Sequence, residues 1–317
     1  METQLIKFKR LILNFFLIIF ISVTSFTLQA AENKILFNIN QEIITTVDVS
    51  NEISYLRLLN KEIRNLDNKQ IIEIAKNSLI KNTIKKIELK KNIKEIKLKD
   101  QYLDELIKNM YVKIGLQNER DFKTRLRENN INIEQIKEKI SIEVIWNQLI
   151  YKKFIKQVKI DKKKIRDSLS NEKIQYQKKY LLSEIVFNIK EKENLNDKTK
   201  LIKDNIIKNG FKNSALLFSI ADTSKLGGSL GWINENSISE KIKQELFNLQ
   251  IGQQTNTILI PGGFLILNID NISKEKKEIN FEEEFNKIIN DKINEQLMQF
   301  SNMYFNKVQK NLTINEI

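Results

Sequence analysis

Apolar residues recur at every third or fourth position through most of this chain, which is the period of an amphipathic helix. The segment Lys34–Ile44 differs, because its apolar residues lie on either side of Asn40-Gln41, and it predicts two short strands joined by a turn. Thr45 and Asp48 have the spacing of a capping box, which predicts a helix from there to about Asn60. The helical period then predicts further helices at about 69–91, 101–113 and 119–129.

The segment Ile133–Ile155 is apolar on two opposite faces of a helix. Such a helix is normally packed between other elements, so we expect it at the centre of a helical domain. Its Trp146 is then a core residue rather than a platform for a ligand. One face carries Ile133, Ile136, Ile140, Val144, Tyr151 and Ile155, and the other carries Ile142, Trp146 and Leu149.

The helical period returns near the end of the chain, from Phe281 to Leu312. A single amphipathic helix cannot bury its apolar stripe by itself, so this one is expected to pack on the N-terminal helices. The middle of the chain would then be an insertion between two parts of one helical domain.

Between about residues 175 and 272 the pattern changes to short strands and short helices. Pro261-Gly262-Gly263 predicts a tight turn between the last two strands. The order of elements indicates an α+β domain of roughly a hundred residues. The predicted elements are a buried strand at 180–187, helices at 197–208 and 212–219, a strand entered through Gly227–Trp232, a helix at 238–249, and strands at 255–260 and 263–271.

The first thirty-one residues have the three-part plan of a secretory signal. A basic stretch at 7–10 precedes the apolar stretch Leu11–Phe26, and small residues lead to Ala30 and Ala31, after either of which we predict cleavage. The alternative is a retained membrane anchor, although the stretch is short for a membrane span and polar residues interrupt it. Export of a chain without Cys or His points to a bacterial periplasm.

Composition narrows the chemistry. Lys and Arg number 53 against 40 Asp and Glu, but only seven of the basic residues are Arg. Lys alternates with Glu along the predicted helices, as on solvated surfaces, so nucleic-acid binding is not expected. Cys and His are absent, which excludes disulfides, thiol nucleophiles, His-based acid–base catalysis and almost every zinc or iron site. We expect no metal and no cofactor.

Three motifs in the middle of the chain occur in an informative order. Gly227–Trp232 reads G-G-x-L-G-W, Leu249–Gly252 has the spacing Leu-x-x-Gly, and the last strand reads G-G-F-L-I-L. With a helix of about a dozen residues between the first two, this segment resembles the parvulin-type (PpiC, rotamase) family of peptidyl-prolyl isomerases. The export signal, the N-terminal helices and the returning C-terminal helix are similar to those of SurA-like periplasmic chaperones.

The resemblance implies a fold class and a domain organisation. The class is α+β, with a mostly helical SurA-type chaperone domain, built from N-terminal helices and a returning C-terminal helix, and an inserted parvulin-like α/β domain. The implied boundaries are 1–31 for the signal peptide, 32–174 for the N-terminal helical domain, 175–273 for the parvulin-like domain, and 274–317 for the C-terminal helix.

The resemblance also implies where a site would lie. Parvulins hold the target proline in an apolar pocket, beside polar groups that hydrogen-bond around the twisting amide. Matched motif to motif, the polar positions are occupied by Glu184, Ala221, Gly262 and Leu265, in place of the family's His, Cys or Asp, Ser and His. No catalytic residue is therefore assigned. Glu184 is expected to be a solvated or capping carboxylate, and Leu265 a core strand residue, while Asp222 could substitute for Ala221 only with a shift of register.

The apolar side of the pocket is better preserved. Its expected binding residues are Leu230, Trp232, Ile238, Ile242 and Phe264. Prolyl isomerisation has a barrier of roughly 18–20 kcal/mol, and an apolar groove without polar partners binds planar and twisted amides nearly equally, so it accelerates little.

The implied function is that of a periplasmic holdase chaperone. Its partners would be unfolded or extended polypeptides, with outer-membrane proteins as the expected clients, no nucleic acid, and contact with a membrane only through the signal segment. One alternative is an active parvulin-type isomerase with a diverged site. Another is a chaperone anchored in the inner membrane by its first segment.

Overall fold

The computed structural model of the protein describes residues 33–60, 63–64, 66–170, 175–189, 193–277 and 280–317. Contacts divide the chain into residues 1–34 and 35–317, and the description below concerns the second unit. The predicted signal peptide lies outside the described residues. Within the described ranges, no helix combines the length and the apolar character that crossing a membrane requires.

A small sheet joins the two ends of this unit. The predicted strand pair forms as β1 (Ile35–Ile39) and β2 (Glu42–Thr45), and a third strand, β7 (Ile314–Glu316), pairs antiparallel with β1 on its other edge. Phe37 thereby lies between Ile44 and Glu316. β7 was not predicted, because three residues are too few to show an alternating pattern.

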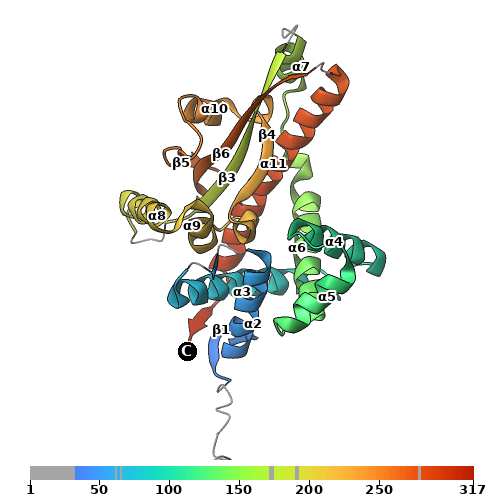
Figure 1. Ribbon diagram of the computed structural model, residues 1–317, viewed down its shortest axis with the longest axis vertical. Helices are drawn as coiled ribbons and strands as arrows, with labels where there is room; N and C mark the ends of the chain where they lie inside the picture. Colours follow the sequence, from blue (N-terminus) through green and yellow to red (C-terminus); the bar gives the residue numbers. More distant parts are fainter. Residues whose placement is uncertain (1–32, 61–62, 65, 171–174, 190–192, 278–279) are drawn as a thin grey trace, which may run out of the picture. The chain divides into compact units, whose positions relative to one another are not determined.

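The N-terminal helices follow the predicted ranges closely. The capping box forms, since the Thr45 hydroxyl accepts from the Asp48 backbone N–H at 3.3 Å and the Asp48 carboxylate accepts from the Thr45 N–H at 2.8 Å. This fixes the start of the first helix. The helices are α2 (Thr46–Leu59), α3 (Asn68–Lys90), α4 (Asp100–Lys113), α5 (Glu119–Glu128) and α6 (Ile133–Phe154), shown in Figure 1.

α6 lies between two apolar clusters, as its two-faced pattern predicts. Ile142, Trp146 and Ile150 pack into a core shared with β1, α2 and α3, whereas Ile136 packs with α4 and α5. Trp146 is fully buried, which confirms it as a core residue. The expectation for Tyr151 was wrong: its side chain is 54% exposed, because the cluster of α4 and α5 follows α6 only as far as Ile145.

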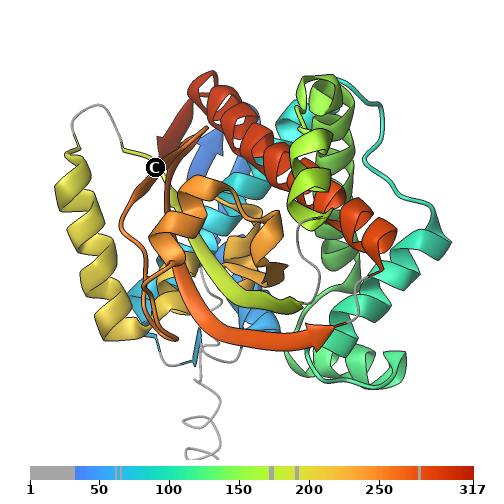
Figure 2. The ribbon, with the colours of Figure 1, turned by 90° about the horizontal axis from the view of Figure 1, so that it is seen from above.

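The C-terminal helix α11 (Phe281–Lys310) packs on α3 and α6, which confirms its predicted partner. The Trp146 indole N–H donates to the Ser301 hydroxyl at 2.8 Å, and the rings of Phe154 and Phe300 stack at 5.0 Å. Figure 2 shows α11 in red beside α6 in green. A further helix, α7 (Lys162–Ser170), also packs on α11. It was not predicted, because Ile165 and Leu169 are its two buried apolar residues.

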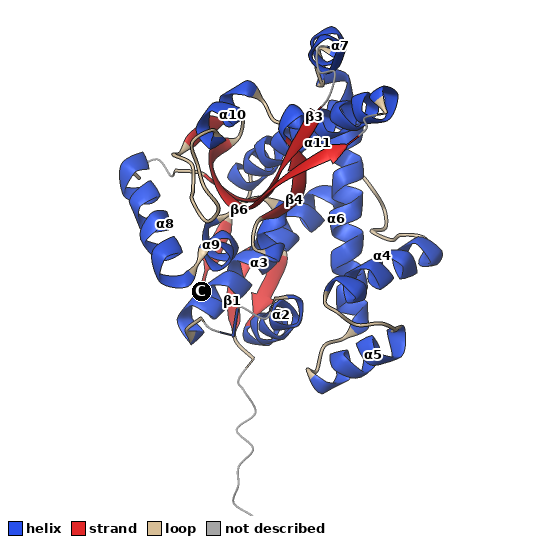
Figure 3. Cartoon of the chain, turned by 45° about the horizontal axis from the view of Figure 1, so that its top comes forward, coloured by secondary structure: helices blue, strands red, loops and turns tan. Residues whose placement is uncertain are grey.

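The middle of the chain forms a four-stranded antiparallel sheet of order β4-β3-β6-β5, inserted between α7 and α11 (Figure 3). This confirms the α+β class with an inserted domain. The strands are β3 (Gln175–Phe187), β4 (Ser229–Asn234), β5 (Ile258–Ile260) and β6 (Gly263–Lys277), and the helices are α8 (Leu195–Asn209), α9 (Phe211–Phe218) and α10 (Glu240–Leu246).

Alternating residues of the two central strands build a core on each face of this sheet. Leu182 and Leu267 belong to the core on the α10 face, which also contains Leu246. Ile185 and Ile266 belong to the core on the other face, which contains Ile202 of α8 and Phe211 of α9. Residues of β3 with even numbers therefore face α10, and this parity decides which side chains reach the site.

The strand lengths differ from those predicted. β3 and β6 pair with each other from Gln175↔Lys277 to Phe187↔Phe264, well beyond the predicted 180–187 and 263–271. Backbone hydrogen bonds hold the polar ends of this ribbon, so no apolar alternation marks them in the sequence. Conversely, the strand predicted at 255–260 is shortened to β5, and the helix predicted at 238–249 is shortened to α10.

Candidate functional site

A cavity of about 290 Å³ opens on the α10 face of the inserted sheet. The walls that the inserted domain contributes are almost entirely apolar, and the expected binding residues Leu230, Trp232, Ile238 and Ile242 are among them. Trp232 is 47% exposed, so its ring is available at the mouth of the cavity. The sheet also supplies apolar wall residues, which are Leu182, Val186, Ile233, Ile260, Leu265 and Leu267.

Phe264, the fifth expected binding residue, lies elsewhere. Successive residues of a strand point to opposite faces of a sheet, so Phe264 and its neighbour Leu265 cannot both face the cavity. Leu265 lines the cavity, whereas Phe264 belongs to the core under α8 and α9, with its ring centroid 5.7 Å from that of Phe187.

The helix α11 forms the wall opposite the sheet. Hydrogen bonds hold it against the inserted domain. Among them, Ser237 donates to Asp291 at 2.8 Å, Asn234 donates to Glu284 at 2.6 Å, and Asn306 donates to the Gly262 carbonyl at 3.0 Å. These contributions were not foreseen from the sequence. One feature of the sequence indicates this wall: α11 has a second, mostly polar face whose residues recur every three or four positions. The residues of this face that line the cavity are Asp291, Asn294, Glu295, Met298, Gln299 and Asn302.

Glu184 is the charged group that β3 contributes to the cavity. It lies at an even-numbered position of β3, pairs with Leu267 of β6, and is 5% exposed. The Thr223 hydroxyl donates to one of its carboxyl oxygens at 2.8 Å. Within the described part of the chain, the second oxygen has no hydrogen-bond partner and no Lys or Arg lies within ion-pair distance. The expectation of a solvated or capping carboxylate was wrong, because β3 carries this side chain into the interior.

Burial raises the pKa of the Glu184 carboxyl to about 7. The hydrogen bond from Thr223 lowers it and the negative charge of Asp222 raises it, but burial is the largest cause. The carboxyl therefore changes its protonation near neutral pH, where it can act either as a donor or as an acceptor.

A glycine makes room for this arrangement. The Glu184 N–H donates to the Gly228 carbonyl at 2.8 Å, and a Cβ at Gly228 would lie 2.2 Å from the Glu184 carbonyl oxygen. The φ of Gly228 is +79°, in the left-handed region that favours glycine. The G-G-x-L-G-W motif thus serves the close approach of β4 to β3 beside the cavity.

The other three positions of the implied polar cluster offer no polar side chain. Leu265 is 5% exposed and belongs to the core, as expected. Ala221 is buried at the start of η3 (Asp222–Leu226). Gly262 lies in the turn before β6, where an added Cβ would be 3.1 Å from Met303 of α11.

A second cavity of about 370 Å³ adjoins the first along α11. Its walls come from η3, α11 and α6, and they include the half-exposed Tyr151. The two cavities share four lining residues, Glu184, Asn294, Met298 and Asn302. We call the two together the α11 groove. It runs from the inserted sheet to the helical domain, with Glu184 where its two halves meet.

Charged residues fix the other side of η3 to the helical domain. Lys85 of α3 pairs with Glu143 of α6 at 2.7 Å and also with Asp222, and Lys225 pairs with the same Glu143. Burial opposes ionisation of Glu143, but Lys225 and Lys85 lower the pKa of its carboxyl overall. Asp222 is thus engaged by Lys85, and it also lines the second cavity. We call Lys85, Glu143, Asp222 and Lys225 the η3 ion cluster.

Lys81 lies beside the η3 ion cluster, where its ammonium donates to the Ser219 carbonyl and to the Ser224 hydroxyl. Burial lowers the pKa of Lys81 to about 7, with opposing contributions from the charges around it. Lys81 lines neither half of the α11 groove.

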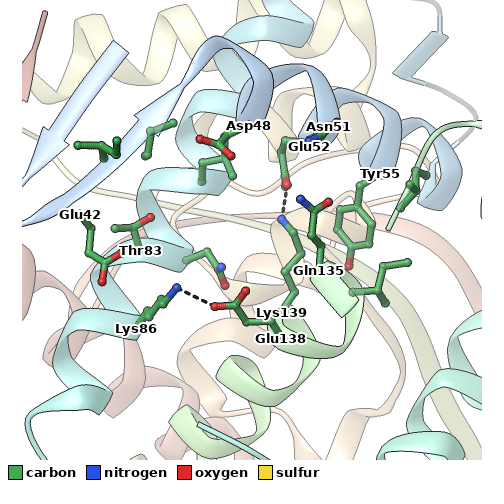
Figure 4. Close-up of a pocket in the computed structure, with 16 residues that line it drawn as sticks. Glu42, Asp48, Asn51, Glu52, Tyr55, Thr83, Lys86, Gln135, Glu138 and Lys139 are labelled. Carbon is green, nitrogen blue, oxygen red and sulfur yellow. Dashed lines mark hydrogen bonds and ion pairs between the residues drawn. The ribbon is translucent and has the colours of Figure 1, made fainter. Parts of the chain in front are cut away.

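A third cavity, of about 170 Å³, lies within the helical domain and is lined mainly by β2, α2, α3 and α6 (Figure 4). Glu52, which is 1% exposed, pairs with Lys139 and accepts from the Ser78 hydroxyl at 2.6 Å. Lys86 and Glu138 form a second ion pair across its rim at 2.7 Å. The polar groups of this cavity are thus largely paired with one another.

Residues 182–271 match the family model described as a PPIC-type peptidyl-prolyl isomerase (rotamase) domain. The chaperone SurA of Pseudomonas putida is 21% identical over 158 residues, which are 47% of this chain and 37% of that chaperone's length. This chain thus covers well under half of that relative.

Two solved structures are similar over more of the chain. One belongs to a pair of SurA-like chaperones of Campylobacter jejuni, a virulence factor and a periplasmic protein; it is 18% identical, covers 90% of this chain and 99% of that one, and has a TM-score of 0.34. The isomerase PrsA of Bacillus anthracis is 18% identical, covers 75% and 98%, and has a TM-score of 0.30. The chain carries a PPIC-type rotamase domain at residues 182–271.

Proposed function

We propose that this chain, a SurA-like protein with a PPIC-type rotamase domain, is an exported holdase chaperone that binds extended segments of unfolded polypeptides in the α11 groove. The observation that carries the proposal is the apolar wall made by Leu230, Ile238 and Ile242, with Trp232 exposed at its mouth. An extended segment could bury apolar side chains there at about 25 cal/mol per Å² of area removed from water. Delaying aggregation in this way requires no chemistry.

The proposal includes weak or absent catalysis. Three of the four positions of the implied polar cluster are Ala221, Gly262 and Leu265, which offer no side-chain hydrogen bond to a twisting amide. Without groups that bind the twisted amide better than the planar one, a groove lowers the isomerisation barrier little. The bound clients we propose are unfolded exported proteins, with outer-membrane proteins foremost among them.

An active isomerase is the second candidate, and one observation favours it. Glu184 and Thr223 form a polar pair at the middle of the groove, where the family has its first-strand His. A carboxyl that titrates near neutral pH could hydrogen-bond to an amide in one of its protonation states.

An isomerase assay with a proline peptide, run without a coupling protease, separates the two candidates. We expect a rate within about twofold of the uncatalysed reaction, because the groove lacks groups specific for the twisted amide. A larger acceleration that is lost on changing Ile242 would establish the enzyme instead.

An aggregation assay with an unfolded β-barrel protein tests the holdase function directly. Ile242→Asp places a charge in the apolar wall and is expected to weaken suppression roughly tenfold, since an unpaired carboxylate resists burial. Ile207→Asp is the matched control, because Ile207 lies on α8 outside the groove and is 84% exposed. Equal suppression by both variants would contradict binding in the groove, and Ile242→Ala serves if the charged variant does not fold.

The export part of the proposal rests on the pattern of residues 1–31. The mass of the protein recovered from the cell envelope tests it. Loss of about thirty residues supports cleavage after Ala30 or Ala31, whereas an intact Met1 would favour a retained membrane anchor.

A further inference from the structure

The α11 groove contains a polar feature that holding an apolar chain does not require. Glu184 lies where the two halves of the groove meet, on a wall that is otherwise apolar on the side of the sheet. It is 95% buried, and one of its carboxyl oxygens has no partner among the described residues. Because Glu184 lines the groove, a ligand that displaces water from it must supply this oxygen with a hydrogen-bond partner.

An extended polypeptide in the groove would bring such a partner. Each residue of a polypeptide carries a carbonyl oxygen that must keep a hydrogen bond when it leaves water. In the apolar half of the groove, the inserted domain offers few donors besides a protonated Glu184 carboxyl. The Thr223 hydroxyl occupies the first oxygen, which leaves the second for the ligand.

We propose that the Glu184 carboxyl, in its protonated form, donates a hydrogen bond to a backbone carbonyl of the bound segment, and that its ionisation releases the segment. This inference rests on the proposed function, because it assumes that a polypeptide occupies the groove. It makes Glu184 a residue that sets the pH range of binding, whether or not any isomerisation follows.

Charge around the groove is consistent with this role. Ionised Glu184 would face an apolar wall and the negative Asp222, and in the described chain no Lys or Arg lies within ion-pair distance of it. A neutral segment bound in the groove would remove the remaining water from the carboxyl, and this favours the protonated form. Binding above neutral pH should therefore take up a proton. The titratable and charged groups on the elements packed around it are Asp222 and Lys225 of η3, Lys81 and Lys85 of α3, Glu143 and Tyr151 of α6, and Asp291 and Glu295 of α11.

The test measures proton uptake by the full chain on binding a peptide that has no titratable group. The probe is an end-blocked, extended peptide of Ala, Leu, Phe and Pro, titrated by calorimetry in two buffers of different ionisation enthalpy. At pH 8 we expect uptake of nearly one proton per peptide, and almost none at pH 5.5. The affinity should fall up to roughly 30-fold from pH 6 to pH 8.5, which is the ratio for a group with a pKa of about 7 when only its protonated form binds.

Three variants assign the proton. Glu184→Gln keeps a donor but cannot ionise, so it should bind the peptide with no proton uptake and with an affinity that does not change with pH. Glu295→Gln is the matched control, since burial also raises the pKa of this carboxyl on the opposite wall, and it should keep the full uptake. Thr223→Val removes the hydroxyl that favours the ionised form, so it should move the midpoint to higher pH.

The outcomes are separable. Proton uptake that persists in Glu184→Gln, or that disappears in Glu295→Gln instead, overturns the role of Glu184 while leaving the groove as the binding site. Absence of peptide binding at every pH, in a chain that is folded, would count against the proposed function itself.

Discussion

The cavity in the helical domain and the α11 groove treat their buried carboxylates differently. In the helical domain, Glu52 is paired with Lys139 and with the Ser78 hydroxyl. In the groove, Glu184 has one hydrogen bond, from Thr223, and within the described residues no cation beside it. Both side chains are almost completely buried. Burial alone therefore does not distinguish a structural carboxylate from one that can bind a ligand. The distinction lies in whether the carboxylate is already paired with a cation and hydrogen-bond donors inside the protein.

The walls of the two cavities also differ in whether their polar groups are paired. The cavity of Figure 4 is rimmed by charged groups that pair with one another, so it offers little to an apolar ligand. The α11 groove presents apolar side chains from the sheet, and one oxygen of its Glu184 carboxyl has no hydrogen-bond partner in the described chain. Polar groups that are paired inside the protein contribute to stability, whereas unpaired ones are available for binding.

The largest expected effect comes from breaking the paired site. Glu52→Gln leaves the partly buried Lys139 ammonium without its fully buried carboxylate partner, and we expect a loss of about 3 kcal/mol in the free energy of unfolding. Urea unfolding measures it. Glu138→Gln removes the half-exposed partner of Lys86 and should cost less than about 1 kcal/mol. Neither variant should change peptide affinity; a change in the Glu52 variant would mean that this cavity also binds clients.

The next effect is a pH-dependent change in stability when the unpaired Glu184 is replaced. Folding raises the pKa of Glu184 from 4.5 to about 7, so the folded state holds more protons than the unfolded state between these values. Stability contributed by the protonated group is lost as pH rises through this window. Glu184→Gln should therefore stabilise the protein at pH 8 by about 3 kcal/mol relative to wild type, and by much less at pH 5.

Urea unfolding at both pH values checks this prediction. The exposed Glu105 of α4 provides the control, because Glu105→Gln should change stability by less than about 0.5 kcal/mol at either pH. A Glu184 variant whose stability parallels that of wild type from pH 5 to pH 8 would show that the carboxylate is solvated after all.

The smallest effect tests a groove residue that is already paired. Ser301 lines the groove but accepts the hydrogen bond of the fully buried Trp146 indole. Ser301→Ala should cost about 1–2 kcal/mol of stability, because the indole N–H is left without an acceptor. Peptide affinity should remain unchanged. Asn302→Ala should cause a smaller loss of stability, because the described chain shows no hydrogen bond for the Asn302 side chain.

Much of this architecture follows from local sequence patterns. The capping box at Thr45, the two-faced helix around Trp146 and the turn at Pro261–Gly263 each form as predicted, because each depends on residues close together in the chain. The apolar side of the groove was also predicted through its motif, with Leu230, Ile238 and Ile242 as lining residues.

The site itself was predictable only in part. Phe264 was expected in the groove, but strand parity turns it to the opposite face of the sheet. The wall made by α11 was not foreseen, because its residues lie more than fifty positions after those of β4 and show no motif. The strand 180–187 was predicted to be buried, but Glu184 was expected to be solvated because Ser183 and Glu184 interrupt its apolar residues as surface residues often do.

The sequence by itself determined most of the segments that form helices and strands, the presence of a PPIC-type rotamase domain, and the absence of His and Cys chemistry. These properties depend on residue type and short-range spacing. The tertiary structure decided the pairing of β7 with β1, the closure of the groove by α11 and the environment of Glu184. Burial and charge pairing arise from residues far apart in the chain, so only the folded protein shows that Glu52 is paired while Glu184 is not.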